Sequence, residues 1–161
     1  MTLSQARRNV GELSEPGKMA GYAWSIPIAR GCHVGRVLAR NPDSVCASCY
    51  AGRGRYNQPN VITALERRYQ AWRSNRELWR ESMITILHSR AITRTGLFRW
   101  FDSGDISSQD MIEDIFAVAR ATPNIKHWLP TKEYARALKN QAEVPANVTM
   151  RVSHPMRDRV E

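Results

Sequence analysis

The sequence predicts an α/β protein built on a parallel sheet. The main observation is an alternation of strand-like and helix-like segments over residues 97–153, joined by short polar connections. A length of 161 residues favours a single domain and is too short for a complete eight-unit βα barrel, which needs about 250. We therefore expect one domain over residues 1–161. It comprises a weakly structured segment (1–19), a cysteine loop (31–56) and a β-α-β-α-β unit (97–153).

The composition is globular, with a strongly basic balance. The net charge is +9, and 20 of the 24 basic residues are Arg. Because the guanidinium group suits bidentate contacts with phosphate, this balance permits a nucleic-acid or nucleotide partner. The alternative is an ordinary solvated surface rich in Arg. No segment has the roughly 18–20 apolar residues of a membrane span, and the N-terminus lacks the apolar core of a secretion signal. We expect a cytoplasmic protein that does not enter a membrane.

The first half of the chain predicts one strand, the cysteine loop and two helices. Residues 22–30 alternate like a strand, which Pro27 makes irregular. The first helix is expected to begin at Pro59. Ser74 and Glu77 have the spacing of a capping box, which predicts the start of the second helix. Apolar residues at intervals of three and four mark the buried faces of both helices: Ile62, Leu65, Tyr69, Trp72, Leu78, Trp79, Met83, Ile86 and Leu87.

The second half predicts three strands separated by two helices. The strands are residues 97–101, 125–129 and 148–153. Ser107 or Ser108 is expected to cap the helix between the first two strands, and the next helix starts at Pro130-Thr131 and carries Ala135 and Leu138. His127 lies inside a strand, which favours a packed or paired core residue over a catalytic base.

Polar residues follow each of these three strands. In a parallel sheet the carboxyl ends of the strands share one edge, where ligands bind. The sequence thus predicts that three groups converge there, although helix capping alone explains some of them. These groups are Asp102-Ser103-Gly104-Asp105, Thr131-Lys132 and Ser153-His154.

The three cysteines are the most specific feature of the sequence. Cys32, Cys46 and Cys49 are spaced C-x13-C-x2-C. An odd number of cysteines without a secretion signal argues against a disulfide framework. An iron–sulfur cluster normally takes four thiolates, so three would leave one iron open. A zinc site would need a fourth ligand, for which His88, His127 or His154 is available. The third interpretation is three ordinary buried side chains.

Several motifs together resemble the phage gene product 88 family, which is distantly similar to the radical S-adenosylmethionine superfamily. They are WSIPIARGC, VCASCYAGRGRYNQPNV, RWFDSGDI and HWLPTKEY, and they extend from about residue 24 to residue 153. The superfamily spaces its cysteines Cys-x3-Cys-x2-Cys, whereas the first gap here is 13 residues.

The resemblance implies a partial (β/α) barrel-like sheet with an N-terminal cysteine-rich metal loop. It implies a [4Fe–4S] cluster on Cys32, Cys46 and Cys49, and S-adenosylmethionine on the open iron. Ser103, Gly104 and Asp105 would then contact the methionyl amine. By their place at the same edge of the sheet, Thr131, Lys132 and Ser153 are further candidates for binding the cofactor. For so short a chain, either the barrel is reduced, or a second subunit completes it in a homo-oligomer, or the protein binds a cluster without radical chemistry.

The alternative function is a zinc-stabilised protein without catalysis, which binds nucleic acid or acts as an adaptor. Arg53, Arg55 and Tyr56 are its candidate nucleic-acid contacts because they follow the last cysteine closely.

Overall fold

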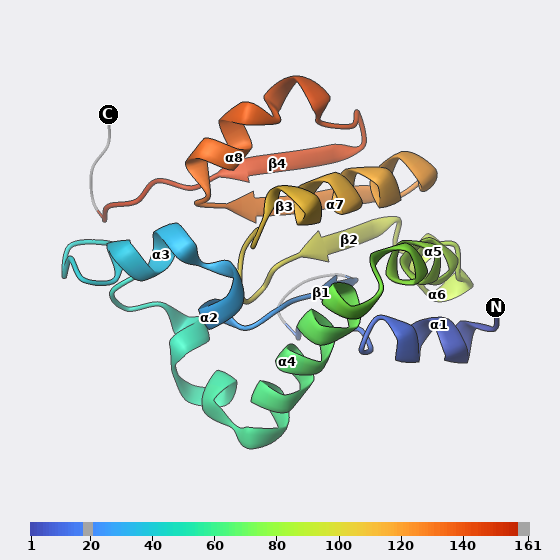
Figure 1. Ribbon diagram of the computed structural model, residues 1–161, viewed down its shortest axis with the longest axis horizontal. Coiled ribbons are helices and arrows are strands. Elements are labelled where there is room, and N and C mark those ends of the chain that lie inside the picture. The colour runs from blue at the N-terminus through green and yellow to red at the C-terminus, as the bar shows by residue number, and fades with distance from the viewer. Residues whose placement is uncertain (18–20, 158–161) are drawn as a thin grey trace.

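The computed structural model describes residues 1–17 and 21–157, which form a mixed α/β fold around a four-stranded parallel sheet (Figure 1). The strands lie in the order β1-β2-β3-β4, and every neighbouring pair is parallel. Their bounds are β1 (Tyr22–Trp24), β2 (Leu97–Trp100), β3 (Lys126–Thr131) and β4 (Val148–Val152). The predicted α/β class and parallel sheet are confirmed. The four described strands form an open sheet, and closure into a barrel is not seen among them.

Eight α-helices and three short 3₁₀ helices accompany the described strands. The α-helices are α1 (Leu3–Asn9), α2 (Ile28–Gly31), α3 (His33–Leu38), α4 (Pro59–Ser74), α5 (Arg76–Leu87), α6 (Arg90–Thr93), α7 (Gln109–Ala121) and α8 (Tyr134–Lys139). The 3₁₀ helices are η1 (Tyr50–Gly52), η2 (Gly54–Asn57) and η3 (Gln141–Glu143). No helix in the described part of the chain is both long enough and apolar enough to cross a membrane.

The N-terminal segment is more ordered than the sequence predicts. Residues 3–9 form α1, whose N-terminus carries a reciprocal capping box between Thr2 and Gln5. Ala6 and the following Val10 are fully buried, and α1 packs against α5. The sequence did not predict this short helix because its apolar pattern is weak. Tertiary packing stabilises α1, and intrinsic helix propensity does not. Residues 18 and 19 of the predicted segment lie outside the described residues.

The first strand and the cysteine loop also differ from the prediction. β1 ends at Trp24 instead of residue 30, because Pro27 starts the short helix α2. Residues 31–56 are not one irregular loop, since they include α3, η1 and most of η2.

The boundary between α4 and α5 lies one residue later than predicted. Ser74 remains in the last turn of α4, and its hydroxyl donates back to the Ala71 carbonyl at 3.3 Å. Asn75 adopts the extended backbone of an N-cap, and its side chain accepts from the Leu78 amide at 3.0 Å. Leu78 itself is exposed, as is Ile62 on α4, so the apolar stripes are narrower than their spacing suggests.

The second half of the chain has the predicted succession of elements. Ser108 caps α7 by accepting from the Met111 amide, as predicted. Strand β3 extends to Thr131, and α8 begins only at Tyr134 instead of at Pro130. Leu138, which α8 carries as predicted, is 74% exposed.

The core lies between the sheet and the helices α5 and α7. Trp24, Trp79 and Trp100 are fully buried and meet at ring-centroid distances of 5.0–6.3 Å. Figure 1 shows α5 and α7 on the viewer's side of the sheet, and their apolar residues belong to the same buried cluster as those of the strands. Burying three indole rings stabilises the fold substantially because each removes a large apolar area from water.

His127 is a paired core residue, as its place in a strand predicts. The Trp100 indole N–H donates to His127 Nδ1 at 3.2 Å, so Nδ1 carries no proton. Nε2 therefore carries the proton, and it lies 3.0 Å from the Thr122 hydroxyl oxygen. The Thr122 hydroxyl in turn donates to the Val118 carbonyl at 2.8 Å. Burial lowers the pKa of His127 from 6.5 to about 4, because the imidazolium form would lose its hydration.

We predict that this histidine makes the fold less stable as the pH falls from 6.5 to 4. In that window His127 is protonated in the unfolded chain and neutral in the folded chain. The free energy of unfolding therefore drops by about 3 kcal/mol in total. Urea unfolding of the wild type and His127→Gln at pH 7, 5.5 and 4.5 measures it. The variant should lose most of the pH dependence in this window. An equal slope in both proteins would contradict the assignment.

Candidate functional site

A cavity of about 260 Å³ lies at the carboxyl edge of the sheet. Residues that follow β2, β3 and β4 line it, together with residues of the cysteine segment. The nine residues predicted to bind a metal or cofactor are all among its lining residues: Cys32, Cys46, Cys49, Ser103, Gly104, Asp105, Thr131, Lys132 and Ser153. These residues therefore lie together at one edge of the sheet, as expected, whereas His154, which belonged to the third predicted group, is not among the lining residues. Binding of a metal or cofactor there stays a prediction.

The local fold brings the three cysteines to this cavity. Cys32 is the junction between α2 and α3, and its carbonyl accepts from the Arg36 amide at 3.0 Å. Cys46 and Cys49 share a turn in which the Cys49 amide donates to the Cys46 carbonyl at 3.3 Å. Ser44 stabilises the start of this turn, because its hydroxyl donates to the Leu38 carbonyl at 2.6 Å.

Two tyrosines after the cysteines attach this segment to the end of β2. The Tyr50 hydroxyl donates to the Asp102 carbonyl at 2.5 Å, and the Tyr56 hydroxyl donates to the Asp102 carboxylate at 3.0 Å. The same carboxylate accepts from Ser25, which follows β1. Asp102 thus serves as a structural anchor for the segment that carries the cysteines.

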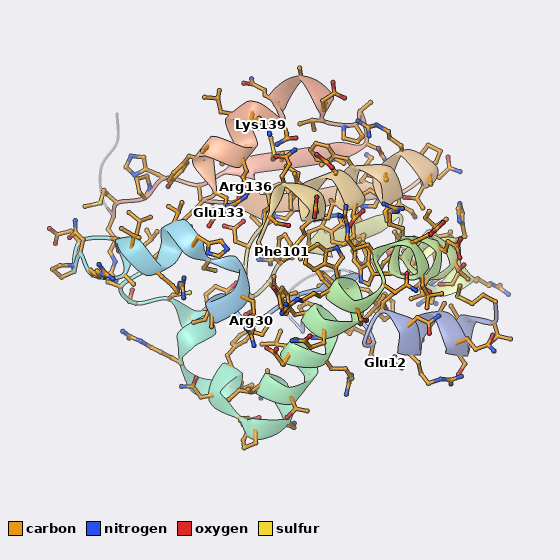
Figure 2. The ribbon with its side chains drawn as sticks, viewed as in Figure 1. Glu12, Arg30, Phe101, Glu133, Arg136 and Lys139 are labelled. Carbon is orange, nitrogen blue, oxygen red and sulfur yellow. The ribbon has the colours of Figure 1, made fainter. Side chains whose placement is uncertain are left out.

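Glu133 attaches the segment to the end of β3. It is buried, and one carboxylate oxygen accepts from the Val34 amide in the first turn of α3 at 2.9 Å. Its other oxygen pairs with Arg136 of α8. Figure 2 shows Glu133 and Arg136 beside each other between α8 and α3. A carboxylate at a helix N-terminus is stabilising because it meets unpaired amides there.

The C-terminal segment holds the far side of the cysteine turn. The Val45 amide donates to the Pro155 carbonyl, and the Arg157 amide donates to the Asp43 carbonyl, both at 3.0 Å. Ser44 and Met156 form an isolated antiparallel bridge between these segments.

The polar residues at the strand ends bond mostly to one another. The Asp105 carboxylate accepts from the Thr131 hydroxyl at 2.6 Å and from the Lys132 and Ile106 amides at 2.8 Å. Burial raises the pKa of Asp105, although these hydrogen bonds act in the opposite direction. The Ser103 hydroxyl donates to the Ile26 carbonyl at 3.2 Å. These side chains build the cavity wall, so cofactor contact by Ser103, Asp105 and Thr131 stays a prediction.

Gly104 is required by both its backbone conformation and its surroundings. Its φ is +81°, and a Cβ atom there would lie 2.5 Å from the Ile26 carbonyl oxygen. The loop after β2 therefore touches the backbone that follows β1, and only glycine permits this approach.

The Cys32 thiol interacts with the other two cysteines and with the Asp105 carboxylate. Burial raises the pKa of Cys32 first of all, and Asp105 and the other two cysteines raise it further. Burial also raises the pKa of Cys46, while the Lys132 ammonium opposes the effect. A bound cation would offset this repulsion and release the thiol protons.

The space between the sulfurs suits a bound group. A methyl group at position 35 would lie 3.5 Å from Cys46 Sγ and 4.0 Å from Cys32 Sγ, so the missing side chain of Gly35 leaves room beside both. All three cysteines also line a second cavity of about 80 Å³ on this side. Three soft sulfur donors around one space fit a thiophilic metal or cluster. Among the described residues, however, no three His, Cys, Asp or Glu side chains are already arranged to hold a metal ion.

The histidines named as fourth zinc ligands lie elsewhere. His127 is bonded within the core, His88 Nδ1 is 3.0 Å from the Ile84 carbonyl, and His154 Nδ1 is 3.0 Å from the Met156 carbonyl. In the described part of the chain, the lining of the two cysteine cavities includes none of the three.

The three residues of the alternative nucleic-acid site have different surroundings, and their contact with nucleic acid stays a prediction. Arg53 donates to the Ala47 carbonyl at 3.2 Å and so supports the cysteine turn, and Tyr56 bonds to Asp102. Arg55 and Tyr56 line a different cavity of about 380 Å³, together with the buried Arg68.

Sequence reasoning missed Tyr50, Arg99 and Glu133, all of which shape the site. Tyr50 and Arg99 line the main cavity, and Glu133 caps α3. Tyr50 directly follows Cys49, and Glu133 directly follows Thr131-Lys132, so adjacency to the predicted residues was the available signal. Arg99 had a different signal, because it is the one charged residue inside the apolar strand LFRWF.

We predict that Gly104→Ala destabilises the protein by about 3 kcal/mol or more, because it combines a left-handed backbone with a steric clash. Gly54→Ala is the matched control. Its φ is also positive, at +55°, but a Cβ there meets nothing within 4 Å. It should cost about 1 kcal/mol. Urea unfolding measures both, and equal losses would show that the close approach at Ile26 is unimportant.

A family model described as Gene product 88 matches residues 6–159 of the chain. No curated protein and no solved structure matches significantly.

Proposed function

The chain belongs to the gene product 88 family, and from its cysteine cavity we propose that it binds an iron–sulfur cluster through Cys32, Cys46 and Cys49. The observation that carries the proposal is the shared cavity. Three thiols from one segment meet the carboxyl ends of three parallel strands around it. This edge is where parallel α/β sheets bind their ligands.

The donor set favours a [4Fe–4S] cluster. Sulfur is the preferred ligand of such clusters, and all three cysteines line both cavities. A cluster held by three thiolates keeps one iron open to a small ligand and supplies electrons to it. The rest of the cavity, about 260 Å³, lies next to the cysteines and offers space for such a ligand.

The chain's own residues hold the thiols and balance their charge. Tyr50 and Glu133 fix the two arms of the cysteine segment to the ends of β2 and β3. Lys132 lies near Cys46 and lowers the cost of a thiolate there. Asp105 accepts a hydrogen bond from the Lys132 amide and so fixes the backbone of this cavity-lining residue.

The finer proposal is radical S-adenosylmethionine-like chemistry on a substrate of unassigned class. The methionyl part of S-adenosylmethionine carries a carboxylate and an ammonium group, and the cavity offers groups of both signs. Lys132 suits the carboxylate, while the carbonyls of the Ser103–Asp105 loop and of Ser153 suit the ammonium group.

We predict that protein purified without oxygen carries about four irons and four sulfides per chain and absorbs broadly near 400 nm, as expected of a cubane. Cys46→Ser and Cys49→Ser should each lose most of the iron, because each removes one ligand. Ala47→Ser is the control in the same turn and should keep it. Iron, sulfide and zinc are measured on each sample, with circular dichroism to check folding. Full iron retention in both cysteine variants would overturn the site, and one zinc without iron would favour the zinc-stabilised alternative.

A second prediction tests the chemistry. The cluster-loaded protein, reduced with dithionite, should convert S-adenosylmethionine to methionine and 5′-deoxyadenosine, with one electron from the reduced cluster and one hydrogen atom from a substrate or the buffer. Lys132→Ala should weaken cofactor binding about 10-fold through loss of one charged hydrogen bond. Lys139→Ala, on the exposed side of α8, is the matched control. Chromatography of the products and calorimetry of binding measure the two effects. A loaded cluster without binding or cleavage would exclude this chemistry and leave the cluster proposal intact.

A further inference from the structure

One face of the sheet is open to solvent at β3 and β4. Alternate residues of a strand point to opposite faces, and in β3 His127, Leu129 and Thr131 are buried on the face that the helices cover. Lys126 and Trp128 point to the other face and are exposed. Trp128 is 40% exposed, which is a large apolar area for the middle of a strand.

The register brings basic residues around this tryptophan. Trp128 is paired with Arg99 of β2 on one side and with Thr149 of β4 on the other. Lys126 precedes Trp128 by two residues on the same face, at about 7 Å along the strand. Arg151, paired with Pro130, is its diagonal neighbour and is exposed.

The exposed side chains of this face have no partner within the described part of the chain. Lys126, Trp128 and Arg151 make no side-chain hydrogen bond or ion pair with its residues, and the Trp128 ring contacts no other ring there. On β2, β3 and β4 the strand positions on this face include no acidic residue. They are Leu97, Arg99, Lys126, Trp128, Pro130, Thr149 and Arg151. We call these seven residues the open face.

We infer that the open face binds single-stranded nucleic acid. An exposed indole offers a stacking surface for an unpaired base, while Lys126 and Arg151 lie where they bind the flanking phosphates. The bases of duplex DNA are stacked on one another and unavailable to the Trp128 ring. An exposed indole beside two cations therefore favours a single strand. The net charge of +9 supports a polyanionic partner, and the absence of acidic side chains at these seven positions makes the face complementary to one.

This surface differs from the basic loop that the sequence suggests. Arg53 and Tyr56 are bonded within the protein, whereas Lys126 and Arg151 are available. Arg99 joins the open face to the cysteine cavity, because it belongs to the former and lines the latter. The inference does not depend on a cluster, since none of its binding groups is a cysteine.

We predict that the full chain binds a fluorescein-labelled dT20 oligonucleotide at 20 mM salt, as measured by fluorescence anisotropy. Trp128→Ala should weaken binding about 10-fold or more, since stacking on one base is lost. Trp128→Phe keeps a ring and should stay within about 3-fold of the wild type. Lys126→Ala with Arg151→Ala should reduce the slope of log affinity against log salt by about 1.4, which corresponds to two phosphates.

Two double variants serve as controls of equal charge. Arg73→Ala with Arg90→Ala removes two exposed cations from α4 and α6 and should leave the slope within about 0.5 of the wild type. Arg53→Ala with Arg55→Ala tests the basic loop.

Three outcomes would overturn the inference. The first is no binding at 20 mM salt, and the second is binding that only the Arg53/Arg55 variant weakens. The third is a dimer, seen by sedimentation, that Trp128→Ala dissociates while oligonucleotide binding is unaffected, because a second copy of the chain would then cover the open face. Repeating the titration with cluster-free Cys46→Ser protein should give the same affinity, which separates this inference from the cluster proposal.

Discussion

The candidate site depends on one buried carboxylate. Asp105 lies in the loop between β2 and α7, and its two oxygens accept hydrogen bonds from the Thr131 hydroxyl and from the Lys132 and Ile106 amides. Two neighbouring strand ends are thereby fixed to each other away from water. A carboxylate in this position is costly to bury, and three donors offset that cost. Removing it would leave these donors unpaired and separate the two walls of the cavity.

The rest of the site is attached to these two strand ends by side-chain hydrogen bonds to backbone groups. Glu133 follows Lys132 directly and reaches the first turn of α3, while Tyr50 reaches the Asp102 carbonyl. The cysteine segment is therefore positioned by groups outside itself. Its three cysteines line a common cavity, and the short helix α3 lies between the first and the second of them. This arrangement resembles a binding loop on a rigid scaffold, where geometry comes from the sheet and chemistry from the loop.

The sequence predicted the succession of strands and helices well and the details of side-chain packing poorly. The succession of elements after residue 97, the Ser108 cap and the position of most of the polar residues follow from local chemistry and from the rule for parallel strands, whereas β1 ends at Trp24 instead of residue 30. Asn75 and Ser74 are both good caps, so only the backbone decides between them. The exposure of Trp128 was not predicted. Parallel sheets are usually covered on both faces, and an apolar strand such as IKHWL gives no sign that one face is open.

The pairing of the cysteine turn with residues 155–157 closes a long loop of the chain. Ser48 and Arg157 contact each other although they are 109 positions apart in the chain. Contacts between residues so distant in sequence slow folding, because the entropy of closing the loop is lost before the contact stabilises the chain. The cysteine turn therefore reaches its final conformation only when residues distant in the sequence have joined it.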